Sequence, residues 1–206
     1  MFFELDHPCV KAKLTILRDR ATGPKQFREC VGEIACLVAC EALRTLELED
    51  VEVVTPMATT RGWRIRNEVV IVPILRAGLG MLEGILRLVP NAKVGFVGLE
   101  RDHLTAEPRE YYCKLPEATA DSVAVVVDPM LATGGSLAAT IDVLKRNGFT
   151  RIVVVTVLAS PEGKRAIAEK HPDVRVYTGC LDAGLNAEKY IVPGLGDAGD
   201  RLFGTL

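Results

Sequence analysis

Residues Ser122–Ser136, which read SVAVVVDPMLATGGS, decide the fold. The run Val123–Val127 is short, continuous and rich in β-branched residues, as expected for a strand buried on both faces of a parallel sheet. It ends at Asp128, and after a loop of small residues the apolar positions recur at helical spacing from residue 137 to residue 144. We therefore predict a strand, a carboxylate, a glycine-rich turn and a helix in succession.

This arrangement is typical of a phosphate-binding site. The first backbone N–H groups of a helix lack partners and carry partial positive charge, which favours an anion. Gly134 and Gly135 let the backbone approach phosphate oxygens, and the hydroxyl groups of Thr133 and Ser136 add donors. Asp128 lies where an open α/β sheet binds its ligand and can accept hydrogen bonds from ribose. The pattern predicts a sugar phosphate, although an ordinary strand and helix joined by a glycine turn is the alternative; the P-loop motif GxxxxGK[ST] does not occur.

Two further apolar runs end at charged residues. Residues 69–75 predict a buried strand that is followed by Arg76–Gly80, RAGLG, whose arginine can hold a diphosphate in a bidentate fork. This turn lacks the third glycine of a dinucleotide-binding motif. Residues 93–99 predict a third strand, after which Arg101 and the stretch to residue 112 have no clear period. We interpret that stretch as an excursion that returns as a β-ribbon.

The rest of the chain alternates helices with strands. We predict an irregular opening, a helix from Pro24 to about Leu46, a short strand at 51–54, a polar, turn-like segment at 57–67, strands at 151–158 and 174–177, and a helix beginning at 160–163. Such alternation is typical of a mainly parallel, doubly wound α/β sheet, here in a single domain of residues 1–206. The arginines at 61, 64 and 66 favour a solvated hairpin over an RNA or phosphate surface.

Composition excludes several classes of protein. The 206 residues carry a net charge of −2, which gives no field that would attract nucleic acid or an anionic membrane. No apolar run reaches transmembrane length and the first residues lack the pattern of a signal peptide, so we expect a cytoplasmic protein. The six cysteines show neither a CxxC pair nor zinc spacing, and Cys36 and Cys40 are interpreted as core thiols rather than as part of a structural metal site.

The C-terminal stretch YIVPGLGDAGDRLFGTL begins at Tyr190 and contains the letters GxGxxG. Too few residues follow Gly199 to complete a dinucleotide-binding unit, so NAD binding is rejected. Pro193 and the glycines instead indicate a rigid loop whose backbone N–H and C=O groups face a small flat ligand. A ligand with donors and acceptors on one edge could be bound by such a loop without a charged side chain.

These three motifs resemble one family. DPMLATGGS, from Asp128, is similar to the phosphoribosyl-pyrophosphate (PRPP) loop of type I phosphoribosyltransferases. Pro129 stands where most of these enzymes have a second acidic residue, and this departure is typical of the uracil branch. PILRAGLGM, from Pro73, resembles the diphosphate loop of uracil phosphoribosyltransferases, and YIVPGLGDAGDR, from Tyr190, resembles their uracil site. The similarity extends from His7 to Thr205.

The resemblance implies the type I phosphoribosyltransferase fold, with a small hood or β-arm built from terminal segments, and a pentosyltransferase that makes UMP and diphosphate from uracil and PRPP in pyrimidine salvage. It implies that PRPP is bound by Arg76, Arg101, Asp128, Pro129, Met130, Leu131, Ala132, Thr133, Gly134, Gly135, Ser136 and Asp197. It assigns uracil to Ile191, Gly196, Asp197 and Ala198. It assigns transition-state positioning and charge stabilisation to Asp128, Arg76, Arg101 and Asp197.

The resemblance also implies partners. Mg²⁺ would be carried mainly by PRPP, with no dedicated set of protein ligands, and a flexible loop over 102–112 would close on the reacting centre. A homodimer or homotetramer is expected, and GTP is an effector that some relatives have and others lack. We expect Asp200 and Arg201 to brace one another. Two alternatives are a phosphoribosyltransferase for another base and, in a different class, an RNA-binding regulator on the same fold.

Overall fold

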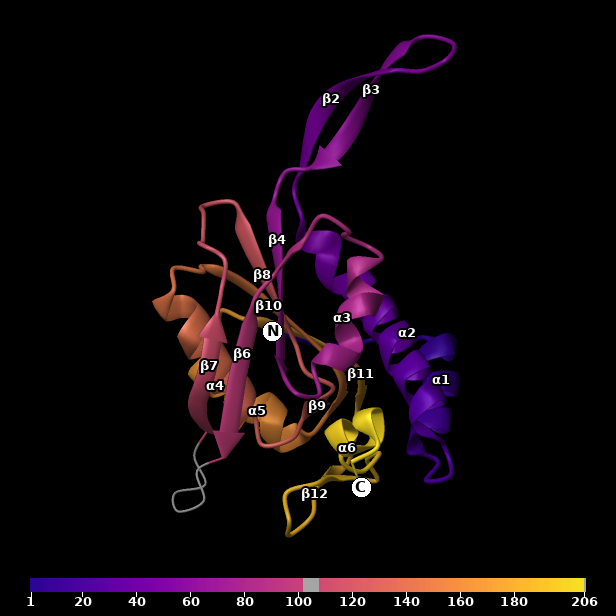
Figure 1. Ribbon diagram of the computed structural model, residues 1–206, viewed down its shortest axis with the longest axis vertical. Helices are drawn as coiled ribbons and strands as arrows, with labels where there is room; N and C mark the ends of the chain where they lie inside the picture. Colours follow the sequence, from indigo (N-terminus) through magenta and orange to yellow (C-terminus); the bar gives the residue numbers. More distant parts are fainter. Residues whose placement is uncertain (102–107, 206) are drawn as a thin grey trace.

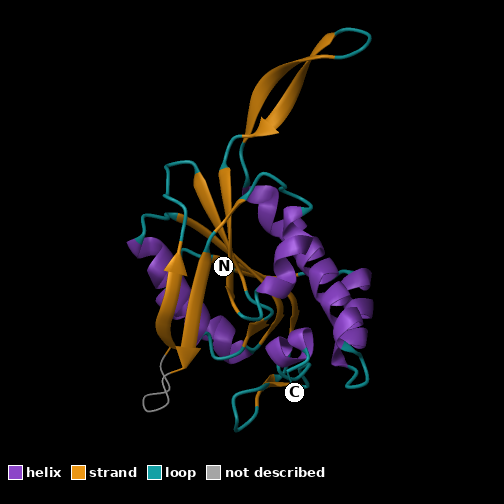
Figure 2. Cartoon of the chain, in the orientation of Figure 1, coloured by secondary structure: helices purple, strands orange, loops and turns teal. Residues whose placement is uncertain are grey.

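The computed structural model describes residues 1–101 and 108–205, and its centre is a nine-stranded sheet (Figures 1 and 2). The main strands are, in spatial order, β1 (Phe2–Glu4), β11 (Arg175–Leu181), β10 (Arg151–Ala159), β8 (Ser122–Val127), β4 (Glu68–Leu75), β6 (Phe96–Arg101) and β7 (Pro108–Lys114). Two short strands pair with β4 and β10 respectively: β5 (Lys93–Val94) and β9 (Met130–Leu131). Neighbouring strands are parallel except β6 and β7, which are antiparallel, so the predicted, mainly parallel α/β sheet is confirmed.

Helices cover both faces of the sheet (Figure 1). One face carries α1 (Pro8–Arg18), α2 (Pro24–Ala42) and α3 (Leu79–Leu86), and the other carries α4 (Gly135–Arg146) and α5 (Pro161–Lys170). None of the helices in residues 1–101 and 108–205 is long and apolar enough to cross a bilayer. The doubly wound arrangement explains why the central strands are apolar without alternation, since both of their faces are buried.

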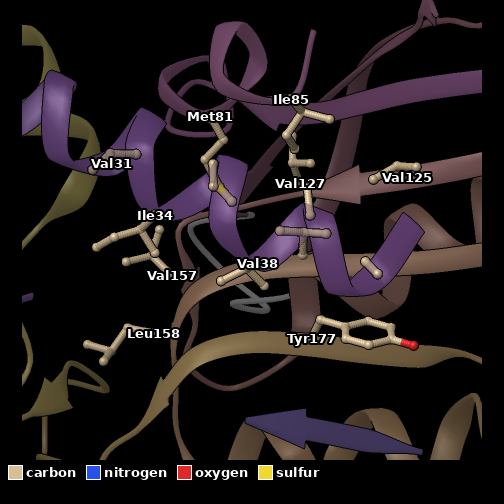
Figure 3. Packing of buried hydrophobic residues seen from close by; sticks show 14 of the residues in the cluster. Val31, Ile34, Val38, Met81, Ile85, Val125, Val127, Val157, Leu158 and Tyr177 are labelled. Atoms are coloured by element: carbon tan, nitrogen blue, oxygen red, sulfur yellow. The ribbon is translucent and has the colours of Figure 1, made fainter. Parts of the chain in front are cut away.

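The two faces of β8 belong to two separate cores. Val125 and Val127 point into a cluster with Ile34 of α2 and Met81 of α3 (Figure 3). Ala124 and Val126 point to the opposite face and pack with Leu144 of α4 in a second cluster. Successive side chains on a strand face opposite sides, so the one apolar run Val123–Val127 anchors helices above and below the sheet.

Two appendages lie at opposite ends of the sheet (Figure 1). The arm is a hairpin formed by β2 (Leu48–Val54) and β3 (Thr59–Ile65). The hood consists of residues 182–205 and contains β12 (Gly184–Leu185), β13 (Ile191–Val192) and α6 (Ala198–Phe203). The hood therefore comes from a terminal segment, as expected, whereas the arm comes from residues 48–65 and not from a chain end.

Several local expectations need correction. Residues 8–18 form α1 rather than an irregular opening, and most of the segment at 57–67 is strand β3 rather than a turn. The helix from Pro24 ends at Ala42 and continues as a short 3₁₀ turn, Leu43–Thr45. The strand expected at 93–99 is interrupted at Gly95, where a Cβ would lie 2.7 Å from a side-chain atom of Leu115. The ribbon expected after residue 101 is present as β7.

Candidate active site

The topology brings two predicted motifs together. In the sheet, β4 lies between β6 and β8. The chain continues from β4 to β6 on one side and then to β8 on the other, so the direction of winding changes between β4 and β8. Open α/β sheets bind ligands outside the carboxyl ends of their strands at such a point. Arg76 follows β4 and Asp128 follows β8, and the two strands are paired in register up to Pro73 and Val127. The arginine and the carboxylate therefore emerge at the same edge of the sheet.

The glycine-rich turn after β8 leads into α4 as predicted. Gly134 precedes the helix with φ = +83°, a conformation that a residue with a side chain rarely adopts. Gly134 offers no side chain to cap α4, so the N–H groups of its first turn have no acceptor from the N-cap residue. Thr133 Oγ1 accepts a hydrogen bond from the backbone N–H of Gly135 at 3.4 Å, which shapes the turn.

The first half of the same loop is anchored in the sheet. The carbonyl oxygen of Pro129 accepts hydrogen bonds from the backbone N–H groups of Val157 and Leu158, at 3.1 and 2.9 Å. Leu131 of β9 pairs with Ala159 of β10, and the Leu131 side chain is buried in the core. Among the residues assigned to PRPP, Pro129 and Leu131 thus serve to hold the loop, and their side chains face the protein interior.

Asp128 has an unusual electrostatic environment. Its Oδ1 accepts a hydrogen bond from the backbone N–H of Met130 at 3.4 Å. The pKa of Asp128 is raised to about 7, chiefly by burial and to a smaller extent by the negative charge of Asp197, against the opposing effect of the Met130 hydrogen bond. The two carboxylates therefore belong to one site, although they are far apart in the sequence. A carboxyl that gives up its proton near neutrality is well suited to accept hydroxyl hydrogen bonds once a cationic partner or ligand arrives.

The loop after β4 packs tightly against the hood and the end of β8. A Cβ on Gly78 would lie 2.5 Å from the carbonyl oxygen of Val127, and one on Gly80 would lie 2.7 Å from the Leu202 side chain. These contacts explain the two glycines of the RAGLG motif, since any side chain would push the loop away. The result is that Arg76 is held between the sheet and the hood.

The guanidinium of Arg76 already has a partner. Its Nη2 donates to Oδ1 of Asp200 in α6 at 3.2 Å, and its Cζ lies 6.0 Å from the centroid of the Phe203 ring. The side chain is still 58% exposed, so an anion can reach it. Arg76 therefore connects the RAGLG loop after β4 to helix α6 of the hood.

A cavity of about 310 Å³ lies where the PRPP loop meets the hood. Its wall contains all four residues that the sequence assigned to uracil: Ile191, Gly196, Asp197 and Ala198. Met130 and Ala132 contribute the opposite side from the PRPP loop. The sequence reasoning missed Glu188, Lys189 and Tyr190, which also line the cavity. Lys189 has φ = +68°, which marks a tight turn before β13, but its type gave no signal for this.

Asp197 has a structural role besides facing the cavity. Its Oδ1 accepts a hydrogen bond from the backbone N–H of Asp200 at 2.9 Å and so caps α6. The expectation that Asp200 and Arg201 brace one another is wrong, because they contact different groups. Asp200 pairs with Arg76, whereas Arg201 donates to the backbone carbonyl groups of Leu195 and Asp19, at 2.7 and 2.6 Å.

Comparisons with known proteins agree with this geometry. A sequence model described as uracil phosphoribosyltransferase matches residues 4–205. A uracil phosphoribosyltransferase from Symbiobacterium thermophilum is 55% identical over 202 residues, which are 98% of this chain and 97% of the relative. Another from Finegoldia magna is 56% identical over 201 residues, 97% and 96% of the two chains. The chain belongs to the uracil phosphoribosyltransferase family.

Solved structures extend the comparison to the fold. The AQ2163 protein from Aquifex aeolicus superposes with a TM-score of 0.93, is 42% identical, and is matched over 98% of both chains. A hypoxanthine-guanine phosphoribosyltransferase from Bacillus anthracis gives a TM-score of 0.54 at 14% identity, over 77% of this chain and 80% of that one. At such low identity the second comparison shows a shared fold alone. The type I phosphoribosyltransferase fold expected from the sequence is confirmed.

Arg101, the second arginine that the family resemblance assigns to the diphosphate, ends β6. Its backbone pairs with Pro108 of β7 at the same edge of the sheet as the other motifs. Residues 102–107 of the expected closing loop lie outside the described residues, and residues 108–112 belong to β7.

The donor set suits a metal ion that is brought by substrate. Among residues 1–101 and 108–205, no three histidine, cysteine or acidic side chains gather in a way that could hold an ion by themselves. The site instead offers the carboxylates of Asp128 and Asp197, which lie close enough for the charge of Asp197 to act on Asp128. Mg²⁺ commonly binds through one or two carboxylates together with water and substrate phosphates, so these residues fit it.

Proposed function

We propose that the chain transfers the 5-phosphoribosyl group of PRPP to N1 of uracil, releasing diphosphate and forming UMP in pyrimidine salvage. The observation that carries this proposal is the shared cavity, in which Met130 and Ala132 of the PRPP loop face Ile191, Gly196 and Ala198 of the hood. A sugar phosphate on the loop and a small flat base in the hood would meet there. Membership of the uracil phosphoribosyltransferase family supports the same reaction.

PRPP would be held at both of its charged ends. The backbone N–H groups at the start of α4, with Thr133 and Ser136, would bind the 5′-phosphate. Asp128 would accept hydrogen bonds from the ribose hydroxyl groups, and Arg76 would bind the diphosphate, for which the solvent-exposed part of its guanidinium is suited. Arg101 is assigned to the diphosphate by resemblance. Mg²⁺ bound with PRPP would neutralise charge on the leaving group.

The reaction is one of positioning and charge stabilisation. The bond from C1′ to the diphosphate oxygen breaks while a bond from uracil N1 to C1′ forms on the opposite face, so the configuration at C1′ inverts. Positive charge develops on the sugar and negative charge on the diphosphate, and Arg76 would stabilise the latter. Asp197, which lines the cavity, would face the ribose or N1 of the base. No covalent attachment to the chain is needed.

Uracil would be recognised by main-chain groups. Ile191, Gly196 and Ala198 carry few side-chain donors or acceptors, so the cavity wall they form presents backbone N–H and C=O groups. A wall of this kind distinguishes bases by the fixed pattern of its donors and acceptors and by its size. We propose that the same wall also excludes the larger purine bases.

We also propose that the protein is a homodimer or homotetramer. The arm exposes large apolar side chains, among which Met57 is 94%, Val54 79% and Trp63 64% exposed. Exposed apolar groups gathered on one projecting hairpin are typical of a contact surface. A second copy of the chain would cover them.

Three further expectations remain proposals. GTP as an effector is proposed from the family resemblance. A cytoplasmic location and a single domain are proposed as well, and in that domain β1 near the N-terminus pairs with β11.

The arginines of the arm support the solvated hairpin over an RNA-binding surface. Arg61 forms hydrogen bonds with both carboxylate oxygens of Asp50, at 2.7 and 2.5 Å. Arg64 pairs with Glu49 across the hairpin, and Arg66 Nη2 lies 3.1 Å from Asp121. Because each guanidinium is already balanced by a carboxylate, the arm offers RNA little net positive charge.

The test is conversion of labelled uracil with PRPP and Mg²⁺, run in parallel with adenine, hypoxanthine and orotate, and repeated with GTP and with EDTA. UMP formed from uracil alone, and lost with EDTA, is the expected result. Product from another base would retain PRPP as the donor and overturn uracil as the acceptor. Binding of PRPP without turnover of any base would overturn the proposed activity.

A further inference from the structure

Asp182 forms a buried ion pair beside the base-binding loop. It follows β11, and its side chain is 4% exposed. Its two carboxylate oxygens accept hydrogen bonds from both terminal nitrogens of Arg18 at the end of α1: Nη1 lies 2.8 Å from Oδ2 and Nη2 lies 2.6 Å from Oδ1. This bidentate geometry is the strong and directional form of the interaction. The two residues are 164 positions apart in the sequence.

The same pair holds both polar backbone groups of Gly194. The N–H of Gly194 donates to Oδ2 of Asp182 at 2.8 Å, and its carbonyl oxygen accepts from Nη1 of Arg18 at 3.0 Å. Gly194 has φ = +63°, and a Cβ there would lie only 2.0 Å from the carbonyl oxygen of Ile191. The turn at Gly194 is therefore tight, and its peptide groups are fixed by side chains from outside the loop.

Gly194 lies between the residues that line the base cavity. Ile191 precedes it by three positions and Gly196 follows it by two, and both are in the cavity wall. A loop that recognises its ligand through side chains tolerates small backbone movements, because rotamers can adjust. A loop that recognises it through backbone groups does not, because any rotation of a peptide moves the donor or acceptor itself.

We propose that Arg18 and Asp182 are positioning residues for the acceptor base: their ion pair fixes the Gly194 turn and thereby the orientation of the main-chain groups that bind it. The inference rests on the proposed function for the identity of the base. Helix α1, which supplies no group to the cavity wall, would thus influence binding of the base through the loop.

Charge balance within the pair agrees with a permanent contact. Burial alone would raise the pKa of Asp182, but hydrogen bonds from Arg18 and from the Gly194 N–H outweigh it and hold the pKa below the usual range. Asp182 thus stays ionised throughout the neutral range. Removing one partner would leave the other charge buried and without its counter-ion.

A second contact joins α1 to the same loop. Arg201 donates through Nη1 to the carbonyl oxygen of Leu195 at 2.7 Å, and also to the carbonyl oxygen of Leu17. Its guanidinium lies over the Phe27 ring, 4.3 Å from the centroid. The end of α1 is therefore tied to two consecutive loop residues, Gly194 and Leu195, by two different arginines.

The experiment measures uracil and PRPP separately in the variants Asp182→Asn and Arg18→Gln and in the double variant. We expect KM for uracil to rise about tenfold in each single variant, as for loss of a charge-assisted hydrogen bond, while KM for PRPP changes by less than about twofold. The double variant should be no worse than the poorer single variant, because the two residues act as one unit. Equal changes in both KM values, or additive effects, would overturn the proposal.

The matched control is Val174→Ala. Val174 is buried directly before β11, at the opposite end of that strand from Asp182, so the substitution destabilises the fold by a cavity without touching the hood. It should leave both KM values unchanged at a comparable loss of thermal stability. A rise in the uracil KM of this variant would mean that general destabilisation explains the result. If Arg18→Gln does not fold, Arg18→Lys, which keeps the charge but not the fork, is expected to give an intermediate uracil KM, and a normal one would overturn the proposal.

A second measurement needs no activity. Amide hydrogen exchange of the peptide covering residues 190–198 should be faster in Asp182→Asn than in the unsubstituted protein and in Val174→Ala, because the carboxylate that accepts from the Gly194 N–H is replaced by an uncharged amide, a weaker acceptor with one oxygen instead of two. Unchanged exchange would overturn the positioning role. If the unsubstituted protein forms no UMP, the proposed function fails, while the exchange measurement still decides whether this pair fixes the loop.

Discussion

Arg76 of the diphosphate loop and Asp200 of the hood form an ion pair across the candidate active site, with Nη2 and Oδ1 3.2 Å apart. The arginine that we assign to the diphosphate is thus held by the hood, the segment in which we propose that the base binds. Its partner Asp200 also accepts a hydrogen bond from Thr205 Oγ1 at 2.6 Å. A diphosphate that binds Arg76 competes with this carboxylate, so binding at the two parts of the site is connected.

The first prediction concerns this competition. Asp200→Asn should lower KM for PRPP by about two- to threefold, because a partly exposed ion pair is weak and its loss frees the guanidinium to bind the diphosphate. Steady-state kinetics at saturating uracil measures the change. Glu83→Gln, which removes an exposed carboxylate paired with Arg87 on α3, should leave the value as it was. A higher KM for PRPP in Asp200→Asn would show that Asp200 orients Arg76 and does not compete for it.

The second prediction concerns Arg76 itself. Arg76→Ala should reduce kcat/KM for PRPP about a hundredfold, equivalent to about 3 kcal/mol, as for removal of one group that stabilises transition-state charge. Arg87→Ala removes an exposed arginine from α3, at the far end of the helix that follows the Arg76 loop, and should retain activity. Circular dichroism and thermal unfolding establish that the fold is intact. Near-native turnover by a folded Arg76→Ala variant would refute the role assigned to this residue.

The third prediction uses the pKa of Asp128. In the folded state this pKa is raised from 3.8 to about 7, so folding takes up a proton between these values. The stability that Asp128 contributes is full below pH about 4, falls as the pH rises, and is lost above pH about 7. Asp128→Asn removes the cost of the buried charge. It should stabilise the protein by about 1 to 2 kcal/mol at about pH 8, a value reduced because the carboxyl is only half-buried, and by less at about pH 5.

Urea unfolding of both proteins at the two pH values measures this difference. The same variant should lose turnover, because an amide accepts the ribose hydroxyl hydrogen bonds less well than a carboxylate, so stability and activity change in opposite directions. Equal stability of the two proteins at both pH values would show that Asp128 titrates in its ordinary range.

Local signals in the sequence were sufficient for the centre of the fold. The segment from Val123 to Leu144 contains its own strand run, turn glycines and helical periodicity, and all of these appear in the structure. The motif after Tyr190 likewise contains four residues that line one cavity together with Met130 and Ala132, and their assignment to the base stays a prediction. Helix α1 was missed although Val10, Leu14 and Leu17 are spaced as on one helix face, because a proline and a histidine near its start were interpreted as an irregular opening.

Other features had no local signal. Strand β1 has three residues and exists because it pairs with β11, at the other end of the chain. The contacts of Arg18 with Asp182, and of Arg201 with the end of α1, join residues more than 160 positions apart. Asp200 and Arg201 are neighbours in the sequence, and proximity suggested a pair that the geometry of α6 does not form. Long-range polar contacts of this kind depend on how the elements pack, and the periodicity of the sequence does not predict that packing.

The last prediction tests whether the PRPP loop is positioned by the helix behind it. Gly163 of α5 packs against the loop so closely that a Cβ would lie 2.5 Å from the carbonyl oxygen of Ala132 and 2.7 Å from that of Leu131. Gly163→Ala should therefore displace the loop, raise KM for PRPP and destabilise the protein by about 1 to 3 kcal/mol, although residue 163 is not assigned to either substrate.

Gly32→Ala in α2 is the matched control for this variant. It adds the same methyl group within a helix, but the nearest atom is the Gly80 carbonyl oxygen at 3.7 Å, an ordinary contact. This variant should be neutral or more stable by up to about 1 kcal/mol, with kinetics unchanged, because alanine favours a helix over glycine. Thermal unfolding and PRPP titration compare the two proteins. If Gly163→Ala binds PRPP normally, the contact between α5 and the carbonyl groups at 131 and 132 serves packing alone, and the loop keeps its shape without it.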